Sequence, residues 1–132
     1  MRNHRSKFDN FTNAVKQLKN GIIMFSNEND LLRDGLIQRF EFTFELAWKT
    51  LKVCFEDEGL QGINSPKSVL REAFSTGLID NDKLWLEILN DRNSTSHIYS
   101  ESLANEICNK IIEKYADAFE KLASQIKIRY FE

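Results

Sequence analysis

The sequence predicts an all-α protein: an antiparallel, up-and-down four-helix bundle with one additional short helix. Long segments place apolar residues three and four positions apart, which is the spacing of one helix face. One Pro and five Gly in 132 residues leave few places to turn, and no segment alternates apolar and polar residues as a half-buried strand does. Residues 1–132 are long enough for one core and are expected to form a single domain.

The first helix is expected over residues 6–25. Its apolar side chains recur at intervals of three and four and form one narrow seam, as in a helix that faces a bundle core. Asn29 or Asp30, in the polar stretch that follows, can cap the next helix. The seam consists of Phe8, Phe11, Val15, Leu18, Ile22 and Phe25.

The second helix, residues 30–58, is the longest and has two apolar faces. One face is wide, and Phe42, Leu46 and Val53 fall on nearly the opposite side. A surface helix needs one apolar face, so this helix either lies between other helices or presents its second face to a partner. Because so small a protein rarely surrounds one helix, the second face is interpreted as a homodimer interface. The wide face is Leu32, Leu36, Ile37, Phe40, Phe44, Ala47, Trp48, Leu51 and Phe55.

A short third helix and a fourth helix follow a loop at residues 59–64. Ser65 and Pro66 are typical of an N-cap and a first helical position, and Gly77 is typical of a helix C-terminus. The fourth helix begins near Asp80. The residues expected to be buried are Val69, Leu70, Ala73 and Phe74 in the third helix, and Leu84, Trp85, Ile88 and Leu89 in the fourth.

The last helix is expected to run without interruption from residue 100 to residue 125 or beyond. Its apolar residues again recur at helical intervals, which predicts one buried face. They are Leu103, Ile107, Ile111, Tyr115, Phe119, Leu122 and Ile126.

The composition limits which partners and which cellular compartment are expected for this protein. A net charge of −2 and a pI near 5.8 provide no bulk attraction for nucleic acid, so any such contact must be local. Cys54 and Cys108 fall within predicted helices, which favours buried, reduced thiols. The basic N-terminal residues, including His4, are interpreted as a disordered tail and not as a signal peptide. No stretch approaches the roughly 18 apolar residues of a membrane span, so a cytoplasmic protein without membrane contact is expected.

Residues 91–99 carry the chemistry that stands out from the helical background. Arg92 can bind a phosphate through its planar fork, and His97 can take or give a proton near neutral pH. In one unbroken helix these two residues would lie about 140° apart, but the polar residues between them favour a turn that could bring them together. Alternatively, Arg92 pairs with Asp91 or Glu87 and His97 is an ordinary residue at a helix start. Both interpretations remain open at this point.

Other chemical candidates are fewer. Glu41 and Glu45 lie four residues apart, either on a solvated face paired with Lys49 or as carboxylates near a cleft, and Glu45 is retained as a candidate binding residue. Asp80 and Asp82 lack the upstream Gly-Ser turn of a nucleotidyltransferase and are interpreted as a helix N-terminus. The chain is therefore not itself expected to be a nucleotidyltransferase. Without a Cys or His cluster or a Gly-rich phosphate loop, no metal or cofactor is expected.

The pattern Arg92, Asn93, His97 and Tyr99 resembles the signature of the HEPN family, the higher-eukaryote and prokaryote nucleotide-binding domains. Two further segments, residues 38–52 and 65–79, resemble the branch of that family called nucleotidyltransferase substrate-binding proteins. The resemblance covers roughly residues 8–122, with the three segments in the same order.

This resemblance implies a homodimer that works with a separate minimal nucleotidyltransferase and holds nucleotide or RNA phosphate in a cleft shared by two copies. Related pairs act as toxin and antitoxin, in which the helical chain is a metal-independent ribonuclease silenced by AMP on the motif tyrosine. Carried over, Arg92 would bind the scissile phosphate, with Asn93 and Glu45 as further binding candidates. His97 would transfer protons, the RNA 2′-hydroxyl would be the nucleophile, and Tyr99 would bind substrate or be modified. A binding subunit and a ribonuclease are thus the two functional hypotheses.

Overall fold

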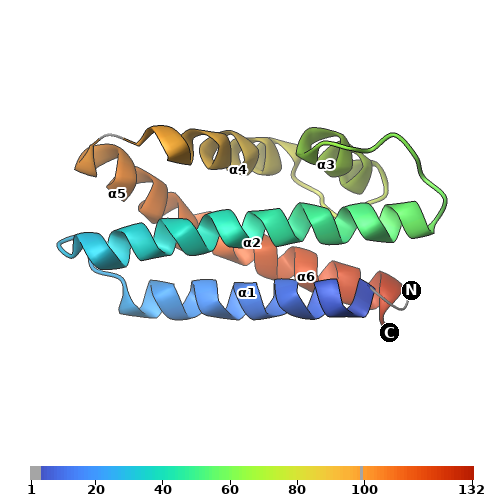
Figure 1. The fold of residues 1–132 in the computed structure, drawn as a ribbon, viewed down its shortest axis with the longest axis horizontal. Coiled ribbons are helices and arrows are strands. Elements are labelled where there is room, and N and C mark those ends of the chain that lie inside the picture. The colour runs from blue at the N-terminus through green and yellow to red at the C-terminus, as the bar shows by residue number, and fades with distance from the viewer. Residues whose placement is uncertain (1–3, 99) are drawn as a thin grey trace.

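The computed structural model describes residues 4–98 and 100–132, and within these ranges the regular structure is helical throughout. The predicted all-α class is confirmed. Figure 1 shows the helices in chain order. They are α1 (His4–Met24), α2 (Asp30–Asp57), α3 (Pro66–Ser75), α4 (Asp82–Ser94), the 3-10 turn η1 (Thr95–His97), α5 (Glu101–Lys110), the π-helical turn η2 (Ile111–Tyr115) and α6 (Ala116–Tyr130).

The four long helical segments run up and down, and α2 lies at the centre of the arrangement (Figure 1). Helix α2 contacts α1, α3, α4, α5 and α6. The short α3 lies in the connection between α2 and α4, and the start of α1 lies at the same end of the bundle as the end of α6. Because every other helix packs on α2, side chains on α2 determine which parts of the chain meet.

Local sequence signals place most helix ends. The side chain of Asn29 caps α2, and Ser65 caps α3 with Pro66 in the first helical position, as predicted. Ser68 completes a capping box with Ser65. Gly77 has φ of 82°, a left-handed conformation that favours glycine after a helix.

The N-terminal expectation is wrong at one point: His4 begins α1 and does not belong to a disordered tail. The first turn has its own stabilising contacts, because the side chain of Arg5 pairs with Asp9 at 3.3 Å and its guanidinium lies over the ring of Phe8.

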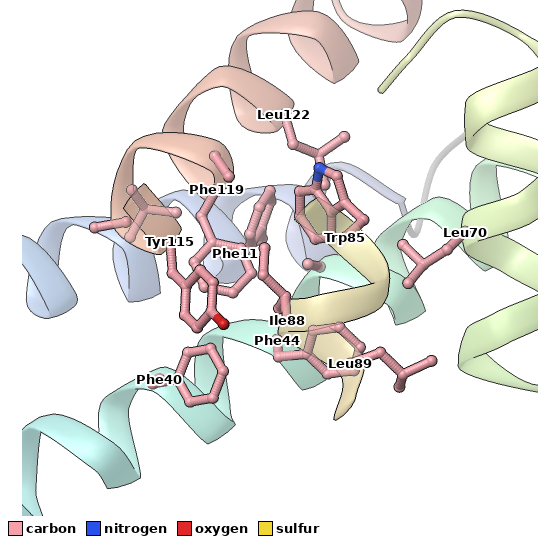
Figure 2. Packing of buried hydrophobic residues seen from close by; sticks show 14 of the residues in the cluster. Phe11, Phe40, Phe44, Leu70, Trp85, Ile88, Leu89, Tyr115, Phe119 and Leu122 are labelled. Atoms are coloured by element: carbon pink, nitrogen blue, oxygen red, sulfur yellow. The ribbon is translucent and has the colours of Figure 1, made fainter. Parts of the chain in front are cut away.

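Aromatic side chains from α1, α2, α4 and the last helical run meet in the core (Figure 2). Phe40 of α2 stacks on Tyr115 with ring centroids 5.5 Å apart, and Trp85 of α4 meets Phe119 edge to face at 5.5 Å. Offset and edge-to-face contacts of this kind add to the stabilisation from apolar burial. The aromatic cluster therefore joins α2 and α4 to the last helical run.

Two residues expected in the core are exposed: Phe74 at 44% and Leu103 at 47% of their surface. Leu70 and Ala73 occupy the core-facing side of α3, and Phe74, one residue further, is rotated about 100° away from it. It forms a wall of a groove between α3 and α4 together with Leu86. Leu103 begins a row of apolar residues that an ordinary helix cannot keep on one face.

The last helical run is continuous but is not a regular α-helix, which corrects the prediction. Its apolar residues from Leu103 to Phe119 recur every four positions, and each step of four drifts about 40° around an α-helix. The π-helical turn η2 absorbs one extra residue, with the Ala116 N–H bonded to the carbonyl of Ile111. Downstream and upstream parts of the row thereby face the same core.

Both cysteines are free and buried, as predicted. Burial raises the pKa of the Cys54 thiol to about 12 and that of Cys108 to about 11, so both are protonated at neutral pH. Within the described ranges, no helix has the length and apolar character needed to cross a bilayer.

Candidate functional site

Arg92 lies in the last turn of α4 and points toward α2, where it meets two carboxylates. Its guanidinium nitrogens lie 3.6 Å from Glu41 Oε2 and 3.7 Å from Glu45 Oε1. The predicted alternative pairing with Asp91 or Glu87 is therefore wrong. Glu41 and Glu45 are one turn apart on α2, so the helical repeat presents both to the same guanidinium.

Thr95 adds a fourth side chain to this group. The Thr95 hydroxyl donates a hydrogen bond of 2.5 Å to Glu41 Oε2, which links η1 directly to α2. We call Arg92, Glu41, Glu45 and Thr95 the Arg92 cluster. Because Glu41 contacts both the end of α4 and the turn after it, one carboxylate fixes the start of the bend that the sequence predicted.

The Arg92 guanidinium is oriented but not saturated. Charge-assisted hydrogen bonds between nitrogen and oxygen are usually about 2.7–2.9 Å long, and the Arg92 pairs are longer. Its Nε atom is buried and has no hydrogen-bond partner among the described residues. The buried Nε is out of reach of a ligand, but the two Nη atoms carry four further N–H donors, and their long contacts leave capacity for another anion.

Glu45 also bonds within its own helix. Its Oε2 accepts a hydrogen bond of 3.3 Å from Trp48 Nε1 and lies 3.5 Å from Lys49 Nζ. The predicted pairing of Glu45 with Lys49 is confirmed, and Glu45 is at the same time a contact of the motif arginine. The two interpretations of this carboxylate are thus both present in the structure.

The Arg92 cluster opens onto a shallow depression of about 240 Å³ lined by Gln38, Glu41, Phe42, Glu45 and Arg92. A larger groove of about 400 Å³ between α1 and α2 shares Gln38 and Phe42 with it. Phe42 is 61% exposed. Of the second apolar face of α2, Phe42 is therefore exposed and borders the charged cluster, whereas Leu46 and Val53 are half-buried.

The remaining motif residues lie around the bend. Asn93 is exposed on α4, and His97 is exposed at the end of η1, where it makes no hydrogen bond or ion pair with any residue that the structure describes. His97 does not line the depression beside Arg92. Tyr99 lies outside the described residues. The chain does bend at this point, because α4 stops at Ser94 and Ile98 is extended with φ of −87° and ψ of 111°.

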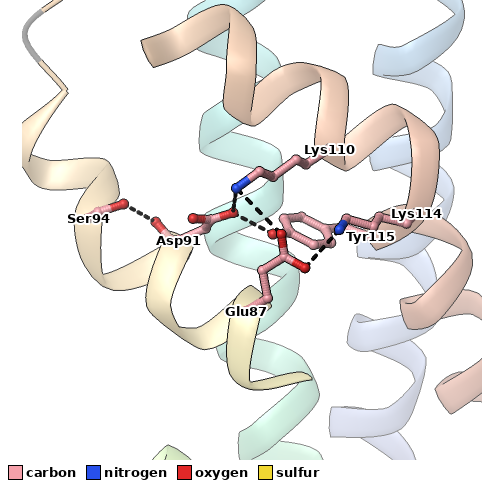
Figure 3. A network of polar contacts seen from close by, with 6 residues as sticks. All are labelled: Glu87, Asp91, Ser94, Lys110, Lys114 and Tyr115. Atoms are coloured by element: carbon pink, nitrogen blue, oxygen red, sulfur yellow. Dashed lines mark hydrogen bonds and ion pairs between the residues drawn. The ribbon is translucent and has the colours of Figure 1, made fainter. Parts of the chain in front are cut away.

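Charged residues on the other side of α4 form a second, denser group (Figure 3). Lys110 Nζ lies 3.2 Å from Asp91 and 3.4 Å from Glu87, and Lys114 Nζ lies 2.7 Å from Glu87. The hydroxyl of Tyr115 donates a hydrogen bond to Asp91. We call these five residues the Tyr115 network. In this network Asp91 and Glu87, the two carboxylates considered as partners of Arg92 from their nearness in sequence, are paired with other residues.

Three groups of the Tyr115 network, Glu87, Lys110 and Tyr115, have pKa values shifted by their neighbours. The hydrogen bond from Lys114 lowers the pKa of Glu87, and burial followed by the bond to Asp91 raises the pKa of Tyr115. Burial disfavours the charged form of Lys110, but Asp91 and Glu87 outweigh it and raise its pKa. Around neutral pH the network is a closed set of satisfied charges.

Sequence reasoning missed Thr95 and the partners of Asp91. Thr95 gave no signal because its bond reaches across 54 positions of sequence to α2. The row of apolar residues spaced by four was a usable signal for η2, and η2 places Lys110, Lys114 and Tyr115 against α4. Across the described residues, no group of three or more His, Cys, Asp and Glu side chains could hold a metal ion.

The helical bundle and the bend after Arg92 together define a protein of the HEPN class. Residues 6–128 match the family model described as "Nucleotidyltransferase substrate binding protein like", and the chain belongs to this family, the HepT-like branch of the HEPN proteins. The resemblance inferred from the three sequence segments is thereby confirmed.

Relatives agree on the family and on the fold. A Haemophilus influenzae protein named probable ribonuclease HepT is 35% identical over an alignment of 112 positions, and the match covers 74% of this chain and 77% of the relative. A crystal structure of a Thermus thermophilus protein is 36% identical, has a TM-score of 0.79 and covers 89% of this chain and 98% of its own. A Haemophilus influenzae structure described as the substrate-binding domain of a nucleotidyltransferase is 29% identical, with a TM-score of 0.63 over 94% of this chain and 96% of its own.

Proposed function

We propose that this protein is the substrate-binding partner subunit of a two-component system with a separate minimal nucleotidyltransferase, and that it holds nucleotide or RNA phosphate beside Arg92. The observation that carries the proposal is the unsaturated Arg92 guanidinium at the edge of an open depression. A phosphate oxygen can take the free donor capacity and form shorter, charge-assisted bonds than the two carboxylates do. The family description and the Haemophilus substrate-binding domain support the partner role.

The proposed working form is a homodimer built on the open face of α2. Phe42 is largely exposed there, and the adjoining groove supplies a concave surface beside it. Glu41 and Glu45 occur on the same stripe as Phe42, so pairing two copies through this face brings two Arg92 clusters toward one cleft. Pairing two copies would supply a second guanidinium for a phosphate, which must compete in each cluster with Glu41 and Glu45 for the arginine.

A ribonuclease is the second candidate, and the relative named probable ribonuclease HepT favours it. In that mechanism Arg92 binds the scissile phosphate and His97 moves the proton, while the 2′-hydroxyl of the RNA attacks. The imidazole of His97 is exposed and has no polar partner among residues 4–98 and 100–132, so it is available for such a role. AMP transferred to Tyr99 by the partner would add negative charge and bulk to the motif.

The first experiment measures binding and cleavage of a short single-stranded RNA by the purified chain in the presence of EDTA. Arg92→Ala should weaken RNA binding by about ten- to a hundredfold, as expected for one charge-assisted contact. The control Arg71→Ala removes an exposed arginine of α3 and should change binding less than twofold. RNA bound without cleavage establishes the binding subunit, and cleavage that His97→Ala abolishes establishes the ribonuclease. Equal binding by the Arg92→Ala and wild-type proteins would overturn both.

The second experiment tests the dimer face. Phe42→Asp or Leu46→Asp should convert the dimer to a monomer in analytical ultracentrifugation, because a carboxylate would be buried between two apolar surfaces. Phe74→Asp is the matched control, since Phe74 is also exposed but lies on α3. A dimer that survives both α2 substitutions places the interface elsewhere.

A further inference from the structure

Arg33 is one of the few charged side chains that the fold buries, and the Arg92 cluster does not use it. It lies in the first turn of α2 and is 7% exposed. Burying a guanidinium costs free energy unless it is paired. Its two ion-pair partners are Asp34, adjacent on α2 at 3.9 Å, and Glu101, the first residue of α5, at 3.6 Å. The contact with Glu101 is the one that joins two helices.

The start of α5 packs on this part of α2. The Cys108 thiol donates a hydrogen bond of 3.6 Å to the Arg33 carbonyl oxygen. Glu101 and Cys108 are seven residues apart, so they lie on the same side of α5 and face α2. Ser100 caps α5, and a carboxylate at Glu101 is favoured by the helix dipole. The ion pair therefore connects a well-formed helix start to α2.

A second connection to α2 lies eight residues further along, where Glu41 accepts the hydrogen bond from Thr95. Eight residues of α-helix span about 12 Å. The two attachments to α2, at Thr95 and Glu101, lie on either side of His97. In the stretch between them Tyr99 lies outside the described residues, and His97 has no polar partner among those described. Its position depends on how firmly the two ends are held.

We propose that Arg33 is a positioning residue for His97, acting through Glu101 to fix the start of α5 against α2. The kinetic part of this inference rests on the proposed proton-transfer role of His97, whereas the structural part does not. Loss of the Arg33–Glu101 pair frees one end of the stretch and lowers the fraction of molecules with the imidazole in place. Arg92 is held separately by Glu41 and Glu45, so phosphate binding is unaffected.

Hydrogen exchange of the purified protein tests the structural part. Glu101→Ala should raise the exchange rates of the amides of residues 96–98 by roughly two- to fivefold, the effect of one exposed ion pair. Asp34→Ala is the matched control: it removes the other carboxylate from Arg33 without touching α5, and should leave these rates unchanged. Unchanged rates in Glu101→Ala, or an equal rise in Asp34→Ala, would overturn the proposal. Glu101 is on the surface, so its variant folds even where a substitution of Arg33 does not.

RNA cleavage kinetics test the functional part. Glu101→Ala should lower kcat with KM unchanged, and Arg33→Lys should retain more of kcat than Arg33→Met, because a lysine keeps the cation. A raised KM with unchanged kcat in Glu101→Ala would assign Arg33 to binding and reject the positioning role. Where the wild-type chain does not cleave RNA, the ribonuclease proposal fails, and the hydrogen-exchange result alone decides the role of Arg33.

Discussion

Helix α4 carries charged residues on two sides, and the two sides are built differently. In the Tyr115 network, two lysines face two carboxylates, contacts are as short as 2.7 Å, and the side chain of Asp91 is only 17% exposed. In the Arg92 cluster, one arginine lies between two carboxylates at 3.6 and 3.7 Å beside an open depression. Satisfied, partly buried charges stabilise the packing of helices, whereas loosely paired charges at a surface can exchange a carboxylate for a ligand.

The largest effect is expected from substitutions of Tyr115, the residue at the centre of the Tyr115 network. Tyr115 is fully buried, so Tyr115→Ala should lower the free energy of unfolding by about 3–5 kcal/mol. Tyr115→Phe keeps the ring and should cost only about 1–2 kcal/mol for the lost bond to Asp91. Urea denaturation followed by circular dichroism measures both. Equal losses in the two variants would mean that the hydroxyl, and not the ring, provides the stabilisation.

A paired substitution compares the two sides directly. Lys110→Met should lower the free energy of unfolding by about 1–2 kcal/mol, because it leaves Asp91 with less compensation in a partly buried position. Arg92→Met should lower it by less than about 1 kcal/mol, because its two ion pairs are longer than hydrogen bonds at 3.6 and 3.7 Å, while RNA binding is weakened. The opposite ranking in urea denaturation, with Arg92 the more stabilising residue, would make the Arg92 cluster a structural feature.

The smallest expected effect is a pH dependence of the free energy of unfolding that comes from the Tyr115 network. Folding lowers the pKa of Glu87 below its ordinary value of 4.5, so its contribution is present above that value and is lost as pH falls through the lowered one. The raised pKa values of Lys110 and Tyr115 act in the opposite sense, and their contributions are lost as pH rises above their ordinary values of 10.5 and 10.0. As pH is lowered from about 7 to 3, the free energy of unfolding should fall less steeply for Glu87→Gln than for wild type. Parallel curves would contradict this assignment.

The sequence allowed the helices, their caps and the open face of α2 to be predicted because these depend on residues close together in the chain. Asn29, Ser65 and Gly77 act within one turn of their own positions. The partner of Arg92 was predicted wrongly for the complementary reason. Its carboxylates are about fifty residues away on α2, and the nearer candidates were already engaged by residues of the last helical run.

The π-helical turn was missed although its signal was present in the sequence. Four consecutive steps of four residues cannot stay on one face of an α-helix, and the excess rotation predicts an extra residue in one turn. Arg33 gave no such signal, because a single arginine in a first turn is common and its burial depends on how α5 packs on it. The periodicity of a sequence predicts which face of a helix is apolar. Which helix packs against that face is known only from the assembled bundle.

The extra residue in η2 makes the last helical run tolerant of a one-residue change in length. A π-helical turn holds one residue more than an α-helical turn, so deleting the exposed Glu113 would leave an uninterrupted α-helix whose two halves keep their present faces. Lys110 would still face Asp91, and Glu101 would still face Arg33. Homologous chains that lack one residue here should therefore keep the charged pairs on both neighbouring helices, and a one-residue gap in an alignment marks only the loss of the π-turn.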